Sequence, residues 1–212
     1  MRVLIACEFS GIVREAFKKQ GWDAWSCDLE DTEISGQHIK GDVLDIINEN
    51  WDLMIAHPPC TYLTVTANKW LKDQPERKSG VLVGAARRQA RQEAIEFFLK
   101  LWNRNIPHIC IENPVGCMST ELKKPDQIIQ PFWFGHKESK KTCLWLENLP
   151  ILKPTNIVEE EPRMVLKSEK TMPEWYARPK HGKERQDMRN RTFQGIADAM
   201  ADQWTTYFKE KK

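Results

Sequence analysis

The chain lacks several patterns that mark common protein classes. It has no apolar run near the roughly 18 residues that a membrane span requires, and its N-terminal run RVLIAC is too short for a secretory signal. It also has no GxGxxG fingerprint for a dinucleotide and no GK[ST] loop for a nucleoside triphosphate. We therefore expect a cytoplasmic protein, and the two most common nucleotide-binding loops are excluded.

Closely spaced cysteines are missing as well. No CxxC pair or dense spacing occurs, which argues against a disulfide scaffold and against a zinc site, so we expect no bound metal. The thiols lie mostly in apolar, strand-like segments and are expected to be buried and reduced. They are Cys7, Cys27, Cys60, Cys110, Cys117 and Cys143.

Neither sign of charge dominates. The chain of 212 residues carries 32 Lys and Arg against 30 Asp and Glu, so no overall field attracts a polyanion and any nucleic-acid contact must be local. A hydrophobic content of 41% is enough for one substantial core, and the length leaves little room for a second domain. We expect a single domain over residues 1–212.

Apolar strand-like runs alternate with helical patterns over the first half of the chain. This alternation predicts an α/β fold with a mostly parallel sheet and helices on both faces, which binds ligands beyond the carboxyl ends of its strands. Residues 116–185 are rich in proline and are expected to be mainly loops, with one strand over 142–146. The other expected strands are 2–7, 23–27, 53–56 and 108–112, and the expected helices begin near Ile12 and cover 85–103 and 193–207.

Small and acidic residues follow the first strands of this pattern. Phe9, Ser10 and Gly11 come after the first strand, Asp28 after the second, and Asp42 precedes the strand that leads to Cys60. A carboxylate at the end of the second strand can accept hydrogen bonds from ribose hydroxyls, and glycine permits close approach to a ligand. Together these residues indicate a nucleoside-type pocket, although either aspartate alone could equally be a solvated carboxylate or a helix cap.

The tetrapeptide His57-Pro58-Pro59-Cys60 follows a buried strand that the prolines bring to an end. A thiol on such a rigid tip has a fixed orientation, and its thiolate form is the nucleophile. An isolated cysteine at a strand end is usually only a buried thiol. The two prolines favour Cys60 as a nucleophile.

A carboxylate ends the next strand, in the run Ile111-Glu112-Asn113-Pro114. Glu112 could protonate or hydrogen-bond a ring nitrogen of a base, provided that burial raises its pKa enough to keep a proton available. The same turn alone could be purely structural. Beside Cys60 it suggests a nucleophile and an acid, with Asn113 next to the substrate.

In this order the motifs FSG, an acidic residue ending the second strand, GDV, PPC and EN resemble the cytosine carbon-5 methyltransferase family. The likeness covers roughly residues 1–115. A weaker likeness over residues 191–200 is to short, phage-type DNA cytosine methyltransferases. The resemblance implies a Rossmann-like S-adenosylmethionine-dependent methyltransferase fold in a phage-type protein of the host cytoplasm. Residues 1–115 would form the cofactor and catalytic core, 116–188 a reduced recognition region, and 189–212 the C-terminal motif and helix.

The resemblance also implies roles for single residues. Cys60 would attack carbon 6 of a cytosine in DNA, and Glu112 would engage the ring nitrogen and the exocyclic amine. Asp28 would bind the ribose hydroxyls of S-adenosylmethionine and Asp42 the adenine amino group. The remaining cofactor contacts would come from Phe9, Ser10, Gly11 and Pro58.

The sequence departs from the family in four places. The large target-recognition region is missing, and in place of the arginine-rich QRRxR strand the nearest candidates are Lys140, Lys141 and Thr142. Arg191 lies where an asparagine-glycine turn is usual, and His57 replaces a glycine-aromatic approach to the proline-cysteine pair. We expect Lys141, Thr142 and Arg191 to contact the substrate, and the basic residues between 178 and 191 to meet phosphates or to form a solvated loop.

Three other functions remain open at this level. The missing recognition region is compatible with a free pyrimidine nucleotide or RNA as the substrate. It is also compatible with a catalytically idle cofactor-binding module whose protein partner supplies recognition. An amino-group methyltransferase, whose [DNS]PP[aromatic] tip also has two prolines, fits less well because His57 and Cys60 flank them here.

Overall fold

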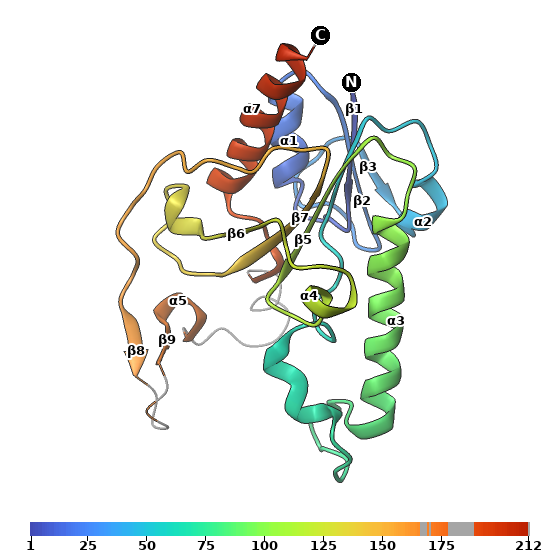
Figure 1. Cartoon of the computed structure of the whole chain (residues 1–212), viewed down its shortest axis with the longest axis vertical. Helices are drawn as coiled ribbons and strands as arrows, with labels where there is room; N and C mark the ends of the chain where they lie inside the picture. Colours follow the sequence, from blue (N-terminus) through green and yellow to red (C-terminus); the bar gives the residue numbers. More distant parts are fainter. Residues whose placement is uncertain (166–168, 170, 178–188, 212) are drawn as a thin grey trace.

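The protein is described by a computed structural model that covers residues 1–165, 169, 171–177 and 189–211 (Figure 1). Its centre is a seven-stranded sheet in the order β3-β2-β1-β4-β5-β7-β6, in which β7 alone runs antiparallel to its neighbours β5 and β6. The strands are β1 (Arg2–Ala6), β2 (Asp23–Asp28), β3 (His38–Lys40), β4 (Leu53–Ala56), β5 (His108–Pro114), β6 (Gln127–Ile129) and β7 (Thr142–Glu147).

Helices cover both faces of this sheet. On one face α1 packs against α7, and the other face is covered by α2 and α3 (Figure 1). A separate hairpin, β8 with β9, leads into α5. The helical elements are α1 (Ile12–Lys19), α2 (Val43–Ile46), η1 (Val65–Leu71), α3 (Gly84–Trp102), α4 (Met118–Glu121), η2 (Pro131–Trp133), α5 (Glu174–Ala177) and α7 (Gln194–Glu210), and the hairpin strands are β8 (Arg163–Val165) and β9 (Thr171–Pro173).

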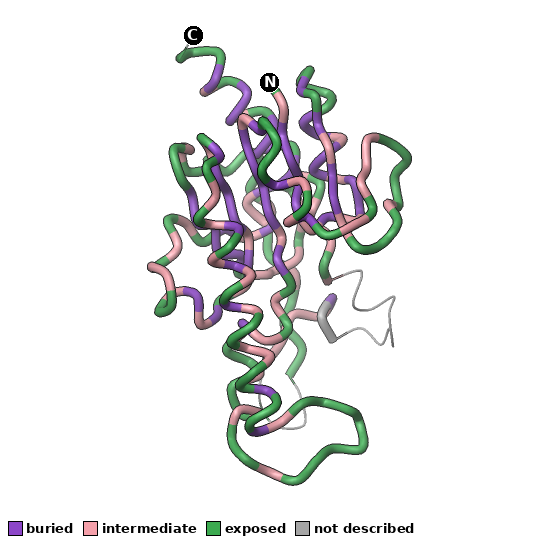
Figure 2. Tube along the Cα trace, turned by 90° about the vertical axis from the view of Figure 1, so that its right-hand side faces the viewer, coloured by how far each residue is buried: buried purple, intermediate pink, exposed green. Residues whose placement is uncertain are grey.

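The apolar strands form two cores because alternate side chains point to opposite faces of a sheet. In β1, Val3 and Ile5 pack with α1 and α7, whereas Leu4 and Ala6 pack with α2 and α3. The strands are therefore buried on both sides, as the purple sheet in Figure 2 shows. The expected α/β fold with a mostly parallel sheet and helices on both faces is confirmed.

Two local expectations need correction. We expected Asn113-Pro114 to break the strand, but β5 continues through Pro114, which pairs with Thr142 of β7. Pairing with β4 has already ended at Ile111, and a proline is tolerated at the last residue of a strand. The region after residue 116 also contains β6 and the β8–β9 hairpin in addition to the expected strand.

Candidate active site

Two groups of loops meet at the carboxyl-end edge of the parallel strands. The first loop cluster (residues 7–11, 28–36 and 41–42) follows β1, β2 and β3. The second loop cluster (residues 57–64, 112–117 and 139–142) follows β4 and β5 and precedes β7, whose antiparallel direction brings its beginning to the same edge. Ligands of open α/β sheets bind at this edge.

Glu8 organises the start of α1. Its Oε1 accepts a hydrogen bond from the Val13 amide at 2.7 Å, and its Oε2 accepts one from the Arg14 amide at 3.3 Å. The Ser10 hydroxyl adds a bond to Glu8 Oε1 at 3.1 Å. The carboxyl is almost fully buried; burial raises its pKa, although His57 and the two amides oppose that rise. Glu8 thus fills the role of a helix cap.

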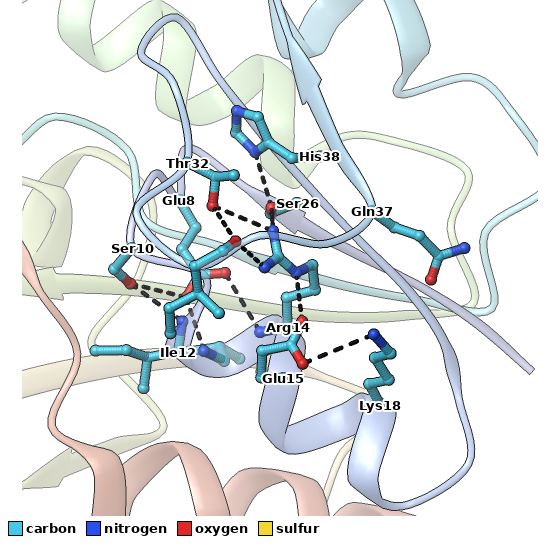
Figure 3. A network of polar contacts seen from close by, with 12 residues as sticks. Glu8, Ser10, Ile12, Arg14, Glu15, Lys18, Ser26, Thr32, Gln37 and His38 are labelled. Atoms are coloured by element: carbon cyan, nitrogen blue, oxygen red, sulfur yellow. Dashed lines mark hydrogen bonds and ion pairs between the residues drawn. The ribbon is translucent and has the colours of Figure 1, made fainter.

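A fully buried arginine supports the first loop cluster from below (Figure 3). The Arg14 guanidinium donates to Ser26 Oγ at 2.9 Å, to Thr32 Oγ1 at 3.2 Å and to the Ile34 carbonyl, and it pairs with Glu15 at 3.0 Å. Sequence reasoning missed this residue because a single arginine in an amphipathic helix is normally exposed. Its bonds join α1, β2 and residues 28–36 into one unit.

Gly11 needs to be a glycine for two reasons. Its φ is +75°, a left-handed conformation that other residues seldom adopt, and a Cβ there would lie 2.7 Å from the Arg14 guanidinium. The neighbouring Phe9 carbonyl accepts a hydrogen bond from the Glu33 amide at 2.9 Å. The FSG loop is therefore shaped by contacts with residues 28–36.

The two aspartates of the expected nucleoside pocket differ in the hydrogen bonds that they already accept within the protein. Asp28 ends β2 as predicted, half-buried, and burial raises its pKa. Its Oδ1 accepts the nearby Glu30 amide at 3.0 Å, and the Leu29 amide also hydrogen-bonds its carboxyl. Asp42 caps α2 by accepting the Leu44 amide at 2.9 Å, the structural alternative noted for it. Asp28 thus fits a ribose more readily than Asp42 fits an adenine.

In the second loop cluster, close backbone contacts fix the segment that carries Cys60. The side-chain Nδ2 of Asn113 donates to the Pro58 carbonyl at 2.8 Å, and the Cys117 backbone N–H donates to the Leu63 carbonyl at 2.9 Å. A Cβ on Gly116 would lie 2.4 Å from that same Leu63 carbonyl. The loops after β4 and β5 are thereby held together, with Cys60 four residues beyond the end of β4.

The half-buried Cys60 thiol is held in its protonated form. Burial raises its pKa, the negative charge of Glu112 raises it further, and the ammonium of Lys140 acts in the opposite direction. Glu112, predicted from the sequence as the partner of Cys60, therefore favours the protonated thiol. A thiol with a raised pKa needs a base to become a thiolate.

Glu112 behaves differently from our expectation. Burial raises its pKa, but a hydrogen bond from His57 and the charge of Lys140 outweigh that effect, so the net pKa is lowered. His57 Nδ1 lies 3.4 Å from Glu112 Oε2. The condition set for Glu112 as an acid, that burial raises its pKa, is not met, because opposite charges and hydrogen bonds compensate for the lost solvent.

The other predicted substrate residues are placed as follows. Thr142 is buried and its hydroxyl helps to lower the pKa of Glu112, whereas Lys141 is exposed. Lys140, which we considered but ranked below Lys141, is the lysine that acts on Glu112; its Nζ donates to the Arg189 carbonyl at 2.9 Å. In an extended segment alternate side chains point to the same side, so residues 140 and 142 lie together. This alternation could have indicated Lys140 in place of Lys141. Arg191 forms an ion pair with Glu33 of the first loop cluster, with a 2.8 Å bond to Oε2.

Three further expectations concern the basic stretch near the C-terminus, bound metal and membrane spans. Most of the basic stretch that we expected to meet phosphates, residues 178–188, lies outside the described residues. Within the described part of the chain, no group of three or more His, Cys, Asp or Glu side chains could hold a metal ion, and no helix is long and apolar enough to cross a membrane.

Comparison with known proteins adds little to this description. No family model matches the chain, and no curated protein matches it significantly. Among solved structures it is similar to a candidate DNA modification methyltransferase encoded within an E. coli prophage, with 13% identity and a TM-score of 0.44. The match covers 75% of this chain and 52% of that structure, so the chain spans about half of its length.

Proposed function

We propose that this chain, as one methyltransferase domain over residues 1–212, transfers a methyl group from S-adenosylmethionine to carbon 5 of cytosine in DNA. The observation that supports this most is the pairing of Cys60 and Glu112 at one edge, on segments from adjacent strands, with the charge of Glu112 acting on the thiol. A nucleophile and a carboxylate in this relation are what addition to a pyrimidine ring requires.

The cofactor would bind at the first loop cluster. Asp28 offers a half-buried carboxylate at the end of β2 for the ribose, and the left-handed Gly11 keeps the loop after β1 free of a side chain. When bound, S-adenosylmethionine supplies an electrophilic methyl group. Glu8 is already engaged as the cap of α1 and is assigned no contact with the cofactor.

The lowered pKa of Glu112 suggests the order of proton movements. Glu112 begins as a carboxylate. Its lowered pKa makes it too weak a base to hold the Cys60 proton by itself, so that proton would pass through Glu112 to the ring nitrogen in concert with formation of the bond between sulfur and carbon 6. The electron pair of the ring double bond moves to carbon 5, which takes the methyl group, and S-adenosylhomocysteine is the leaving group. A base takes the carbon-5 proton, the ring double bond re-forms and the sulfur leaves as a thiolate. The proton on the ring nitrogen returns through Glu112 to Cys60, which restores the thiol.

A basic arm (residues 61–91) favours a nucleic acid over a free nucleotide. It contains seven Lys or Arg against two Asp or Glu, a net charge of +5 in a chain whose total is +2. The arm comprises η1, the start of α3 and the loop between them, which projects at the bottom of Figure 1 and is largely exposed in Figure 2. Because it begins directly after Cys60, a polyanion bound along it would lead to the thiol.

The side chains of the basic arm divide into two groups. Arg87, Arg88 and Arg91 fasten its base by donating to the carbonyls of residues 61, 71 and 62 at 3.0, 2.7 and 2.9 Å. The outward group is exposed, and two of its members lie over the Trp70 ring, Arg77 at 4.1 Å and Lys69 at 4.6 Å. Cations interleaved with an aromatic ring suit phosphates and bases. The outward cations are Lys69, Lys72, Arg77 and Lys78.

The function is tested by transfer of a labelled methyl group to duplex DNA, single-stranded DNA, RNA and free nucleotides. We expect label in DNA as 5-methylcytosine with the wild type, and a loss of at least about 10³-fold for Cys60→Ala. Cys117→Ala is the matched control, since Cys117 is a half-buried thiol in the same loop cluster, and it should retain activity. Label only in RNA or nucleotides would change the substrate class, and unchanged activity of Cys60→Ala would overturn the covalent mechanism.

A further inference from the structure

The turn that carries Cys60 (residues 60–64) is held partly by its own backbone and partly by side chains. The Cys60 carbonyl accepts the Leu63 amide at 3.0 Å, and the Leu63 carbonyl accepts the Cys117 amide at 2.9 Å. The two carbonyls between them, of residues 61 and 62, accept hydrogen bonds from arginine side chains of α3. The position of the turn therefore depends on this helix.

Arg87 makes the first of these bonds. Its Nη2 donates to the Thr61 carbonyl at 3.0 Å, and its guanidinium carbon lies 5.0 Å from the centre of the Tyr62 ring. The residue is only 4% exposed, its Nε is buried without a hydrogen-bond partner, and in the described part of the chain no carboxylate pairs with it. A buried cation without a paired carboxylate costs free energy, so stability alone is a poor reason for this arginine.

Arg91 makes the second bond. Its Nε donates to the Tyr62 carbonyl at 2.9 Å, and its Nη2 donates to Asn68 Oδ1 at 2.6 Å. Residues four apart lie on the same side of a helix, so Arg87 and Arg91 reach the turn together. Arg88 instead donates to the carbonyl of residue 71 at 2.7 Å, farther along the basic arm. Neighbouring arginines of one helix thus differ in whether they hold the turn.

Arg87 also joins two distant points of the basic arm. Its Nη1 donates to the Leu82 carbonyl at 3.5 Å, just before α3 begins at Gly84, and its other bond is to Thr61, directly after Cys60. One guanidinium bonded to both carbonyls closes the arm at its base. The turn with the thiol and the outer part of the arm therefore share a contact.

We propose that Arg87 and Arg91 are positioning residues, which set the orientation of the Cys60 thiol by holding the carbonyls of the two residues that follow it. The main charges that act on the pKa of Cys60 are those of Glu112 and Lys140, so the two arginines reach the thiol through the backbone. The meaning of this role in catalysis rests on the proposed function. The positioning of the thiol does not.

This role predicts how the thiol should respond to substitutions on α3. Arg87→Met should loosen the turn and expose the half-buried Cys60. Burial is the largest cause of the raised pKa of this thiol, so the pKa should fall toward its ordinary value. Arg87→Lys keeps the charge but replaces the fork by one ammonium, and its effect should be smaller. Arg91→Met should act in the same direction as Arg87→Met.

The experiment measures the alkylation of Cys60 by iodoacetamide between pH 6 and pH 10, read from the mass of the peptide that contains it. For Arg87→Met we expect a rate at pH 8 at least about fivefold above that of the wild type, and a profile whose midpoint lies at lower pH. Arg88→Met is the matched control, since it removes a carbonyl bond of the same kind from the same helix. Its profile should equal that of the wild type.

Folded Arg87→Met protein that is alkylated like the wild type would overturn the proposal, and so would an equal rise in the Arg88→Met control. If Arg87→Met does not fold, Arg91→Met decides, and a wild-type profile in that variant overturns the proposal. The measurement needs neither cofactor nor DNA. Failure of the proposed function would show as absent methyl transfer by the wild type, with this alkylation pattern intact.

In an active enzyme the same variants give a second readout. Arg87→Met should lower kcat by at least about tenfold with little change in the KM for DNA, because a misplaced thiol affects the chemical step and not ground-state binding. Arg87→Lys should recover part of the lost kcat. A raised KM with an unchanged kcat would mean that Arg87 serves as a contact for the nucleic acid, and this result would contradict the positioning role.

Discussion

The two loop clusters share one edge of the sheet but differ in how far their buried polar groups are satisfied. In the first, Arg14, Glu8 and Ser10 all have protein partners. In the second, buried atoms of His57, Asn113 and Ser139 have no hydrogen-bond partner among the described residues. Buried polar groups are usually paired, so the second cluster carries free energy that a bound group could recover. The buried polar groups named in the first loop cluster are thus paired within the protein, whereas those named in the second could be paired by a bound group.

The largest expected effect on stability should come from removing the buried arginine of the first loop cluster. Arg14→Met keeps the hydrocarbon stem but leaves Ser26, Thr32 and the Ile34 carbonyl without the guanidinium, and we expect the free energy of unfolding to fall by about 3 kcal/mol. Urea denaturation measures this. Arg88→Met, which removes an exposed pair with Asp73 and an exposed bond to the Leu71 carbonyl, should cost less than about 1 kcal/mol. Equal losses of unfolding free energy in the two variants would show that the buried Arg14 contributes no more to stability than an exposed arginine.

The second largest effect should be that one buried carboxyl from each cluster contributes to folding stability with the opposite pH dependence. The folded-state pKa of Glu112 is lowered, so its stabilising effect is present above the unfolded-state pKa and is lost as pH falls through the folded-state pKa. The folded-state pKa of Glu8 is raised, so the folded state binds its proton first and gains stability as pH falls. Each shift of one pKa unit corresponds to about 1.4 kcal/mol.

These signs are checked by measuring unfolding free energies between pH 7 and pH 4. The difference between wild type and Glu112→Gln should shrink as pH falls, and the difference between wild type and Glu8→Gln should grow. Two differences that change in the same direction would show that the carboxyls do not lie in contrasting environments.

A smaller effect should come from the basic arm, which is proposed to bind the nucleic acid next to the second loop cluster. Changing Lys69, Lys72 and Lys78 of the basic arm to Gln should reduce the salt dependence of DNA binding by up to about 0.9 per lost phosphate contact, with little change in stability. Fluorescence anisotropy over a range of salt concentrations measures this slope. The matched triple change of Lys19, Lys209 and Lys211, exposed at the ends of α1 and α7, should leave the slope nearly unchanged. Identical slopes in both variants would remove the assigned role of the arm.

The smallest effect should come from the surface link between the C-terminal segment and the first cluster. Arg191→Gln removes the pair with Glu33, and because both side chains are more than one-third exposed we expect a loss below about 1 kcal/mol. The pKa of Glu33, now held below its ordinary value by Arg191, should return toward it. NMR titration of the Glu33 carboxyl tests this, and a stability loss of several kcal/mol would mean that the link is part of the support.

Prediction from the sequence succeeded where local patterns determine the result. Strands such as Leu53–Ala56 are uninterrupted apolar runs, and a parallel sheet buried on both faces demands such runs, so their place was evident. The same logic put Asp28, Cys60 and Glu112 at one edge. The assigned chemical roles of these residues remain predictions.

Other features depend on contacts that no local pattern reveals. The burial of Arg14 depends on Ser26 and Thr32, which are distant in sequence, and the lowered pKa of Glu112 depends on His57 and Lys140 from two other segments. The β8–β9 hairpin was missed because its strands are only three residues long and largely exposed, without a clear alternation of apolar side chains. Long-range charge compensation is the common reason for the misses at the site.

The central claim is that Cys60 forms a covalent bond to a cytosine, and trapping tests it most directly. DNA of mixed sequence with 5-fluorocytosine in place of cytosine would be incubated with the protein and S-adenosylmethionine, because fluorine at carbon 5 blocks the final elimination. We predict a denaturation-resistant complex, with the nucleotide attached to the Cys60 peptide by mass spectrometry, retained in Cys117→Ala and absent in Cys60→Ala. Methyl transfer to ordinary DNA without such a complex, or a complex that persists in Cys60→Ala, would contradict the account.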